Sequence, residues 1–201
     1  MIVKSIAFDF FGVLTAEPYL ISKVLYPFVS EFVSVDEVCA RYAVARTNKI
    51  SEEQFWKGIP DWMHKKEKFL NAVEPRDCVS ALQNLSPRFV LGIISNTCFD
   101  WNAILMKRFA LDKLFKVILL SNETGIAKPS AEVFKLFLER SAFAASECLF
   151  VDDQPSNLAA ASAAEMKTVL FETSAWPEQE NLFVPDAQIK SLSELEALLD
   201  A

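Results

Sequence analysis

Apolar and polar residues follow two different patterns along this chain. Residues 4–8 form a short apolar run, typical of a buried strand, which stops at Asp9. After it, apolar residues recur at helical spacing, and Ser34 and Ser51 each begin a capping sequence. Residues 16–80 are therefore predicted to be all helical. The expected helices cover residues 19–33, with a break at Pro27, and residues 34–48, 51–56, 61–73 and 76–85.

From residue 88 onward, short apolar runs alternate with helical segments. The expected strands cover residues 89–94, 117–120, 148–151 and 168–171, and the expected helices residues 101–109, 130–140, 156–165 and 193–199. Strands that are apolar throughout and alternate with helices are typical of a parallel sheet covered on both faces. We therefore expect an α/β core formed by residues 1–15 and 81–201, with residues 16–80 inserted as a helical cap domain.

Composition narrows the class of protein and of partner. With 201 residues, 52% of them hydrophobic, the chain can fill the core of one domain that carries an insertion. No apolar run reaches the roughly 18 residues that span a bilayer, and Met1 leads into a strand without a charged leader, so we expect a cytoplasmic protein. A net charge of −7 argues against nucleic-acid and anionic-membrane partners.

The cysteines do not form a recognisable metal or disulfide pattern. They are widely separated, without a Cys-x-x-Cys pair, and only His64 could join them in a zinc site. His64 lies between charged residues and is expected at the surface. We therefore expect reduced and mostly buried thiols at Cys39, Cys78, Cys98 and Cys148.

Polar residues follow three of the predicted strands. They are Asp9, the Ser95-Asn96-Thr97 segment and the Asp152-Asp153 pair, and parallel strands bring their carboxyl ends to one edge of the sheet. Three carboxylates in one crevice repel each other unless a cation lies between them, and their hard oxygens favour magnesium. Lys128 lies just before a helix start, where Pro129 is favoured at the first turn, and it adds the positive charge that an anion needs. Together these groups describe a phosphate site.

Each of these residues also has a structural interpretation when it is taken alone. Asp152 or Asp153 could cap the following helix, Ser95 could be a turn residue, and Lys128 could be a solvated charge. The ordered set, rather than any single member, favours a functional site.

Four ordered segments resemble the haloacid-dehalogenase-like hydrolase superfamily, in the branch with a helical cap (C1-type) after the first strand. They are FDFFGVLT, IISNT, GIAKPSAEVF and LFVDDQPSNLAAA, and they span nearly the whole chain. The resemblance implies a Rossmann-like three-layer core and a nucleophilic Asp9 that becomes an aspartyl phosphate. For substrate binding, it implies that Ser95 and Lys128 hold the phosphoryl oxygens and that Asn96 adds polar contacts. For metal binding, it implies that Asp9, the Phe11 main-chain carbonyl and Asp153 hold magnesium. Asp152 would act mostly through water, and Asn157 would steady the acidic loop.

Phe11 departs from the pattern of the superfamily. Most of its phosphatases carry a second aspartate there, which protonates the leaving oxygen and then activates water. Phenylalanine does neither, so a proton-transfer step worth roughly 10²–10⁴-fold is missing. Glu17, near the cap hinge, is a candidate substitute, although an exposed linker acid is the favoured interpretation.

Aromatic residues of the cap have two interpretations. They could line a substrate pocket, but aromatic residues at helical spacing more often belong to a core. The residues concerned are Tyr42, Phe55, Trp56 and Trp62.

The expected function is that of a magnesium-dependent phosphomonoesterase. Its partner would be a small phosphorylated metabolite, such as a sugar phosphate. The sequence predicts neither the identity of this metabolite nor the oligomeric state of the protein. One alternative is a catalytically weak relative that binds a phosphometabolite or a protein partner. A 2-haloacid dehalogenase ranks lower, because dehalogenases lack the acids that Asp152 and Asp153 supply here.

Overall fold

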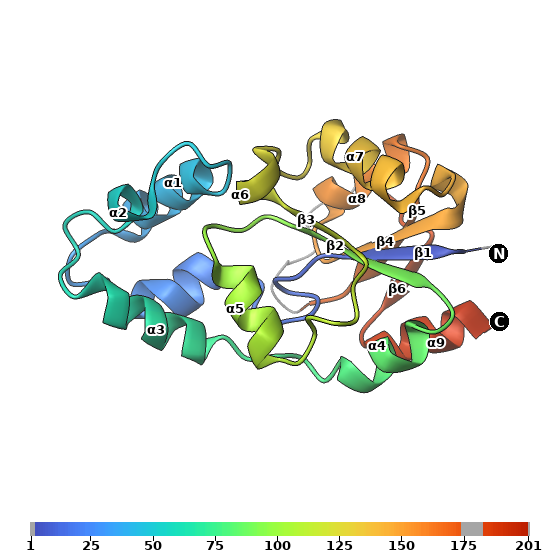
Figure 1. The fold of residues 1–201 in the computed structure, drawn as a ribbon, viewed down its shortest axis with the longest axis horizontal. Coiled ribbons are helices and arrows are strands. Elements are labelled where there is room, and N and C mark those ends of the chain that lie inside the picture. The colour runs from blue at the N-terminus through green and yellow to red at the C-terminus, as the bar shows by residue number, and fades with distance from the viewer. Residues whose placement is uncertain (1–2, 174–182, 201) are drawn as a thin grey trace.

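The centre of the molecule is a six-stranded parallel sheet (Figure 1). The computed structural model describes residues 3–173 and 183–200. The strand order is β3-β2-β1-β4-β5-β6, so β1 lies between β2 and β4 with Ser5 level with both Val90 and Cys148. The strands are β1 (Ser5–Phe8), β2 (Val90–Ser95), β3 (Val117–Leu120), β4 (Cys148–Asp152), β5 (Lys167–Phe171) and β6 (Ala187–Ile189).

Helices cover both faces of the sheet and complete the three-layer α/β/α core. Figure 1 shows α7 and α8 on one side of the sheet and α4 and α9 on the other. The apolar residues of the central strands are buried because both faces of the sheet are covered, as the pattern predicted. The core helices are α4 (Val79–Leu85), α5 (Trp101–Arg108), α6 (Ser121–Thr124), α7 (Ala131–Ser141), α8 (Pro155–Ala163) and α9 (Leu192–Asp200), with a short 3-10 helix η3 (Ala145–Glu147).

The segment between β1 and α4 is helical, as expected, and lies beyond the end of the sheet in Figure 1. Its helices are η1 (Leu20–Leu25), η2 (Tyr26–Phe28), α1 (Val35–Ala45), α2 (Glu52–Phe55) and α3 (Trp62–Ala72). Two chain segments join it to the core side by side, since Thr15 and Pro75 form an antiparallel bridge and the Arg76 N–H donates to the Leu14 carbonyl at 2.9 Å. We propose that residues 16–80 form a cap domain bounded by this pair of linkers.

The helix expected over residues 19–33 is replaced by two short irregular pieces. Residues 20–25 form π-helical turns, in which the Tyr26 N–H donates to the Ile21 carbonyl five residues earlier, and a 3-10 turn follows. Pro27 is the physical reason, because it offers no N–H and its ring clashes with the carbonyl four residues before it in a regular α-helix.

Other differences concern the ends of predicted elements and a few short elements that were not predicted. The helix expected from residue 76 begins at Val79, because Arg76 is held in the linker pairing with Leu14. The helix expected over residues 130–140 covers Ala131–Ser141, with Ser130 as its N-cap, whose hydroxyl accepts the Glu132 N–H at 3.3 Å. The short elements β6, α6 and η3 were not predicted, since three or four residues carry too little periodicity to be recognised.

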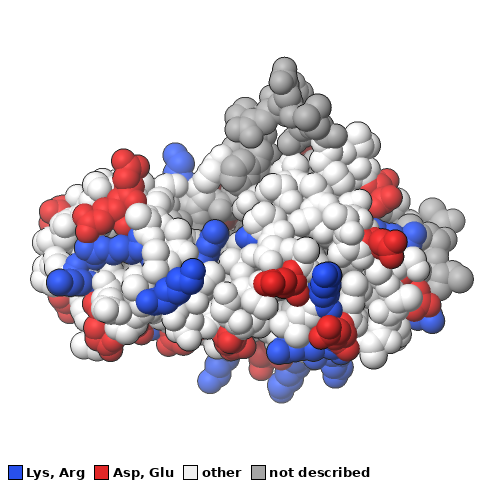
Figure 2. Space-filling model, turned by 90° about the horizontal axis from the view of Figure 1, so that it is seen from above, with Lys and Arg blue, Asp and Glu red and all other residues white. Residues whose placement is uncertain are grey.

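The helices, the surface charges and the cysteines can each be compared with what the sequence predicted. Among the described residues, none of the helices has both the length and the apolar character needed to cross a membrane. Acidic and basic side chains are interspersed on the face of the molecule seen in Figure 2. The thiols of all four cysteines are free, and three of them, Cys78, Cys98 and Cys148, are buried.

Candidate active site

Three aspartates meet at the carboxyl ends of β1 and β4. Asp9 follows β1, while Asp152 ends β4 and Asp153 comes directly after it, and the parallel pairing of the two strands brings them together. Each offers a carboxylate oxygen, these oxygens lie within 4.8 Å of one another, and all three residues are buried. This is the acidic crevice that the sequence predicted.

Lys128 lies within this cluster rather than in solvent. Its Nζ is 2.8 Å from Asp9 Oδ1 and 2.7 Å from Asp152 Oδ2, and its side chain is 1% exposed. Three carboxylates and one ammonium group leave a formal charge of −2 in the crevice, which equals the charge that one divalent cation would neutralise. The cluster therefore has the charge and the hard oxygen donors that suit magnesium.

Burial and the neighbouring charges both shift the pKa values of Asp9 and Lys128. Burial raises the pKa of Asp9 to about 8, and the neighbouring Asp152 and Asp153 add to this shift while Lys128 opposes it. For Lys128, burial disfavours the charge, but Asp152 and Asp9 outweigh that effect, so its pKa lies above its ordinary value. Lys128 therefore stays charged, and a further cation would favour the ionised form of Asp9.

Asn96 fixes the position of Lys128. The Lys128 N–H donates to Asn96 Oδ1 at 2.8 Å, and Asn96 Nδ2 donates to the Lys128 carbonyl at 3.0 Å. The Tyr42 hydroxyl, which comes from the helical insertion, donates to the Asn96 main-chain carbonyl at 2.8 Å. Asn96 lines the cavity, but its side-chain amide is engaged with the Lys128 backbone, a role that the sequence did not reveal.

Asp152 is held by a set of donors around both of its oxygens. Oδ1 accepts the Gln154 N–H at 2.7 Å and Asn157 Nδ2 at 3.1 Å, while Oδ2 accepts Asn157 Nδ2 at 3.0 Å and Lys128 at 2.7 Å. Asn157 thus contacts both oxygens of Asp152, and both oxygens are engaged by donors of the protein.

Ser95 ends β2 at the same edge of the sheet and is 2% exposed. Its Oγ has no hydrogen-bond partner within the described parts of the chain. A buried hydroxyl without a partner is costly, so this oxygen is suited to binding a ligand oxygen. The observation supports the phosphoryl-binding role expected for Ser95.

Gly12 lets the loop after β1 pass close to the acids. Its φ is +93°, and a Cβ placed on it would lie 2.7 Å from Asp153 Oδ2. A side chain at residue 12 is therefore excluded both by the backbone conformation and by the close approach. Arg76 Nη2 donates to the Gly12 carbonyl at 3.0 Å and ties this loop to the second linker.

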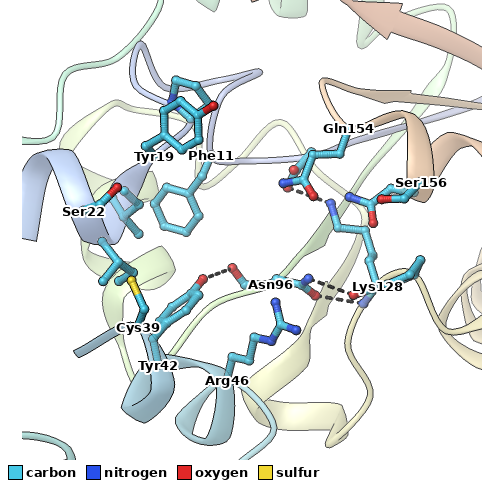
Figure 3. A pocket seen from close by; sticks show the side chains of 16 residues that line it. Phe11, Tyr19, Ser22, Cys39, Tyr42, Arg46, Asn96, Lys128, Gln154 and Ser156 are labelled. Atoms are coloured by element: carbon cyan, nitrogen blue, oxygen red, sulfur yellow. Dashed lines mark hydrogen bonds and ion pairs between the residues drawn. The ribbon is translucent and has the colours of Figure 1, made fainter. Parts of the chain in front are cut away.

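A cavity of about 330 Å³ opens over the cluster, between the core and the helical insertion. Figure 3 shows residues from both sides around it. The core contributes Asp9, Lys128 and Asn157, and the insertion contributes Ile21, Tyr42 and Arg46. Tyr42 is thus a cavity residue. Phe55 and Trp56 are instead buried in the hydrophobic interior, and Trp62 packs against it.

Phe11 forms part of the apolar wall of the cavity. It is 7% exposed and packs edge-on against Phe10, with ring centroids 5.1 Å apart. Glu17 does not line this cavity; it borders a separate hollow with Arg76, and its Oε1 accepts the Tyr19 N–H at 2.9 Å. The arrangement favours the linker interpretation of Glu17, and His64 is at the surface, as expected.

Comparisons with known proteins identify the family of the chain. A family model described as haloacid dehalogenase-like hydrolase matches residues 6–171. Over 100 residues, the chain is 33% identical to the ribulose-1,5-bisphosphate 5-phosphatase of Halopiger xanaduensis. That match covers 49% of this chain and 42% of the relative, so it spans less than half of the relative's length.

Solved structures share the fold over nearly the full chain. A HAD phosphatase from Thermococcus onnurineus matches with a TM-score of 0.76 at 19% identity, covering 98% of both chains. A 2-haloacid dehalogenase from Pseudomonas syringae matches at 0.70 and 23% identity, again covering 98% of both. A Bacteroides thetaiotaomicron HAD enzyme, in complex with magnesium and inorganic phosphate, matches at 0.71 and 20%, covering 90% of this chain and 99% of that one. At such identities these likenesses show the fold alone.

Proposed function

Because this chain belongs to the haloacid dehalogenase-like hydrolase family, we propose that it hydrolyses a small phosphorylated metabolite through an aspartyl phosphate on Asp9. The observation that carries the proposal is the buried cluster of three aspartates bridged by Lys128 at the base of a cavity. A carboxylate nucleophile, a fixed cation and a place for a divalent metal are the main requirements of phosphoryl transfer. The phosphatase named for the Halopiger relative supports the same reaction class.

Magnesium fits the donors that the structure provides. We propose that Asp9, Asp153 and the Phe11 main-chain carbonyl hold it, with Asp152 acting through water. Bound there, the ion would neutralise charge on the phosphoryl group that is transferred. The magnesium and phosphate named for the Bacteroides structure support this choice of ion.

The proposed reaction has two steps. A carboxylate oxygen of Asp9 attacks phosphorus, and the bond to the leaving oxygen breaks with its electron pair remaining on that oxygen. Water then attacks phosphorus, which releases inorganic phosphate and restores the Asp9 carboxylate. Lys128 and the Ser95 hydroxyl would bind the phosphoryl oxygens, while Asn96 would keep the lysine in place.

Phe11 leads to a prediction about the leaving group. Without an acid at residue 11, the first step should depend steeply on the leaving-group pKa, so aryl phosphates should react much faster than alkyl phosphates. Water attack lacks a general base too, so a burst should precede slow turnover. Phe11→Asp should flatten this dependence, because it should raise the rate for alkyl esters by up to about 10²-fold, and it should also shrink the burst. Stopped-flow and steady-state assays over a leaving-group series measure both effects.

Phe11→Leu is the matched control, because it removes the ring without adding a carboxylate. It should keep the steep dependence. Equal rates for alkyl and aryl phosphates without a burst in the natural protein would contradict the prediction. Glu17→Gln would then show whether that acid supplies the proton.

Magnesium should also stabilise the fold. An ion that binds only the native state contributes about 2.7 kcal/mol at a concentration 100-fold above its Kd, which is about 5–10 °C in Tm for a chain of this size. Thermal unfolding with and without millimolar magnesium measures the shift. Asp153→Asn should reduce it, while Asp186→Asn, a change at the aspartate that accepts the Thr168 N–H at 2.7 Å, should keep it. An unchanged Tm would count against the metal site.

Two other functions make different predictions. A binding protein with weak catalysis would not turn over an activated aryl phosphate in the presence of magnesium. A dehalogenase would release halide from a 2-haloacid without metal, and Phe11 is compatible with that reaction because halide needs no proton. The buried acid cluster favours the phosphatase, since its charge suits a divalent cation.

A further inference from the structure

Arg46 brings a second positive charge to the cavity from the side opposite the core. It follows the last residue of α1 and lines the cavity together with Tyr42 and Lys128. In Figure 3 its guanidinium group points into the cavity, near Asn96. The cavity wall thus carries two cations, one at the base and one on the face formed by the insertion.

Arg46 differs from Arg41 in how its surroundings engage its charge. In the part of the chain that is described, its side chain has no ion pair, and its buried Nε has no hydrogen-bond partner. Arg41, on the same helix, shows the contrast, because it pairs with Glu37 at 2.5 Å and donates to the carbonyls of Phe55 and Lys57. A structural role explains Arg41 but leaves Arg46 without an explanation.

The two cations of the cavity differ in what already neutralises them. Lys128 is bridged by Asp9 and Asp152, whereas Arg46 has no carboxylate beside it among the residues described. A guanidinium group binds phosphate or carboxylate through two parallel hydrogen bonds. A cavity of about 330 Å³ is at the small end of ligand pockets, so one compact ligand can reach both ends.

We infer that Arg46 binds a second anionic group of the substrate, so that the substrate class is a short metabolite with one phosphate ester and a further phosphate or carboxylate. The inference rests on the proposed phosphatase function and adds the residue that determines its specificity. The transferred phosphate lies at Asp9 and Lys128, and the second anion lies at Arg46.

The test uses matched pairs of substrates. One pair is a short sugar bisphosphate and the corresponding monophosphate, and the other is phosphoglycerate and glycerol phosphate, which differ by a carboxylate. The natural protein should prefer the doubly anionic member of at least one pair, and the preferred pair identifies the second anion. Arg46→Gln should reduce the ratio of kcat/KM within that pair about 10- to 100-fold, mainly through KM, and Arg46→Lys should retain part of it.

Lys49→Gln is the matched control, since it removes an exposed positive charge just beyond α1 and should leave the ratio unchanged. An equal loss in Lys49→Gln would show a general electrostatic effect and overturn the inference. So would a natural protein that turns over aryl phosphate but shows no preference within either pair.

A binding experiment separates this inference from the proposed function. If the natural protein turns over no phosphate ester, the phosphatase proposal fails, and calorimetric titration of Asp9→Asn with the bisphosphate and the phosphoglycerate still tests Arg46. Tighter binding than for the singly anionic partners, lost in the Asp9→Asn, Arg46→Gln double variant, supports the inference. Equal affinities in the two proteins overturn it.

Discussion

Replacing Asp9 by Asn should reduce turnover by about 10³-fold or more, to the background of the assay. The carboxamide cannot attack phosphorus to form an acyl phosphate, so the first bond is never made. The fold should persist, because an amide oxygen can still accept the Phe10 N–H that now donates to Asp9 Oδ1 at 2.6 Å and the contact with Lys128. Turnover of an aryl phosphate with magnesium, together with circular dichroism and thermal unfolding, measures both parts.

The same substitution at Asp186 is its matched control. Asp186 accepts the Thr168 N–H and hydroxyl at 2.7 and 2.9 Å, away from the acidic cluster. Asp186→Asn should therefore lower stability while turnover remains. A folded Asp9→Asn protein with near-normal turnover would show that the covalent mechanism is wrong. Trapped phosphate on the natural protein, found by mass spectrometry and missing from Asp9→Asn, would support it directly.

The positions of the three aspartates were predictable because the carboxyl ends of parallel strands lie at one edge of a sheet. Asp9 and the Asp152-Asp153 pair follow apolar runs, and parallel strands bring such ends to one edge, so their proximity follows from pattern and topology alone. Five strands of the sheet were predictable as apolar runs, whereas β6, a three-residue strand that contains Gln188, was not. The predicted sheet and the predicted acidic cluster both depend on apolar runs that recur along the chain.

Other features depend on tertiary contacts that leave no pattern in the sequence. The clamp between Asn96 and the Lys128 backbone joins residues 32 positions apart, and the bond from Tyr42 to Asn96 joins residues 54 apart. Arg46 ends an ordinary amphipathic helix, and nothing in its neighbours marks it as a cavity residue. The irregular turns of residues 20–28 show the opposite case, in which Pro27 overrides a helical pattern that was itself clear.

Burial changes what is expected of Lys128. From the sequence, Lys128→Ala should damage catalysis much more than stability, because the acids around it could still face water or magnesium. The structure shows Asp9 and Asp152, the two partners of Lys128, at 5% and 0% exposure, so removing the lysine leaves buried carboxylates without their cation. Breaking a buried ion pair in this way costs about 3–5 kcal/mol, and stability should fall as well.

Lys128→Met is the sharper variant, since it keeps most of the volume and removes only the charge. It should reduce kcat by about 10²–10³-fold, because the cation that stabilises the phosphoryl oxygens is lost. It should also lower the free energy of unfolding by about 3–5 kcal/mol without metal. Magnesium should restore much of that stability, since it supplies positive charge to the same carboxylates, but it should not restore kcat. Denaturant unfolding at several magnesium concentrations, alongside kinetics, separates the two effects.

Lys66 provides the matched control for this change. Its Nζ also bridges two carboxylates, Glu52 at 2.8 Å and Asp100 at 2.7 Å, but its side chain is 14% exposed and it lies outside the cavity. Lys66→Met should lower stability by a smaller amount that magnesium does not restore, and kcat should change at most a few-fold. If Lys128→Met keeps a normal kcat while it loses stability, the lysine serves the fold alone and the phosphoryl group must be bound by other donors. If magnesium restores both stability and kcat, the lysine is only a counter-charge for the acids.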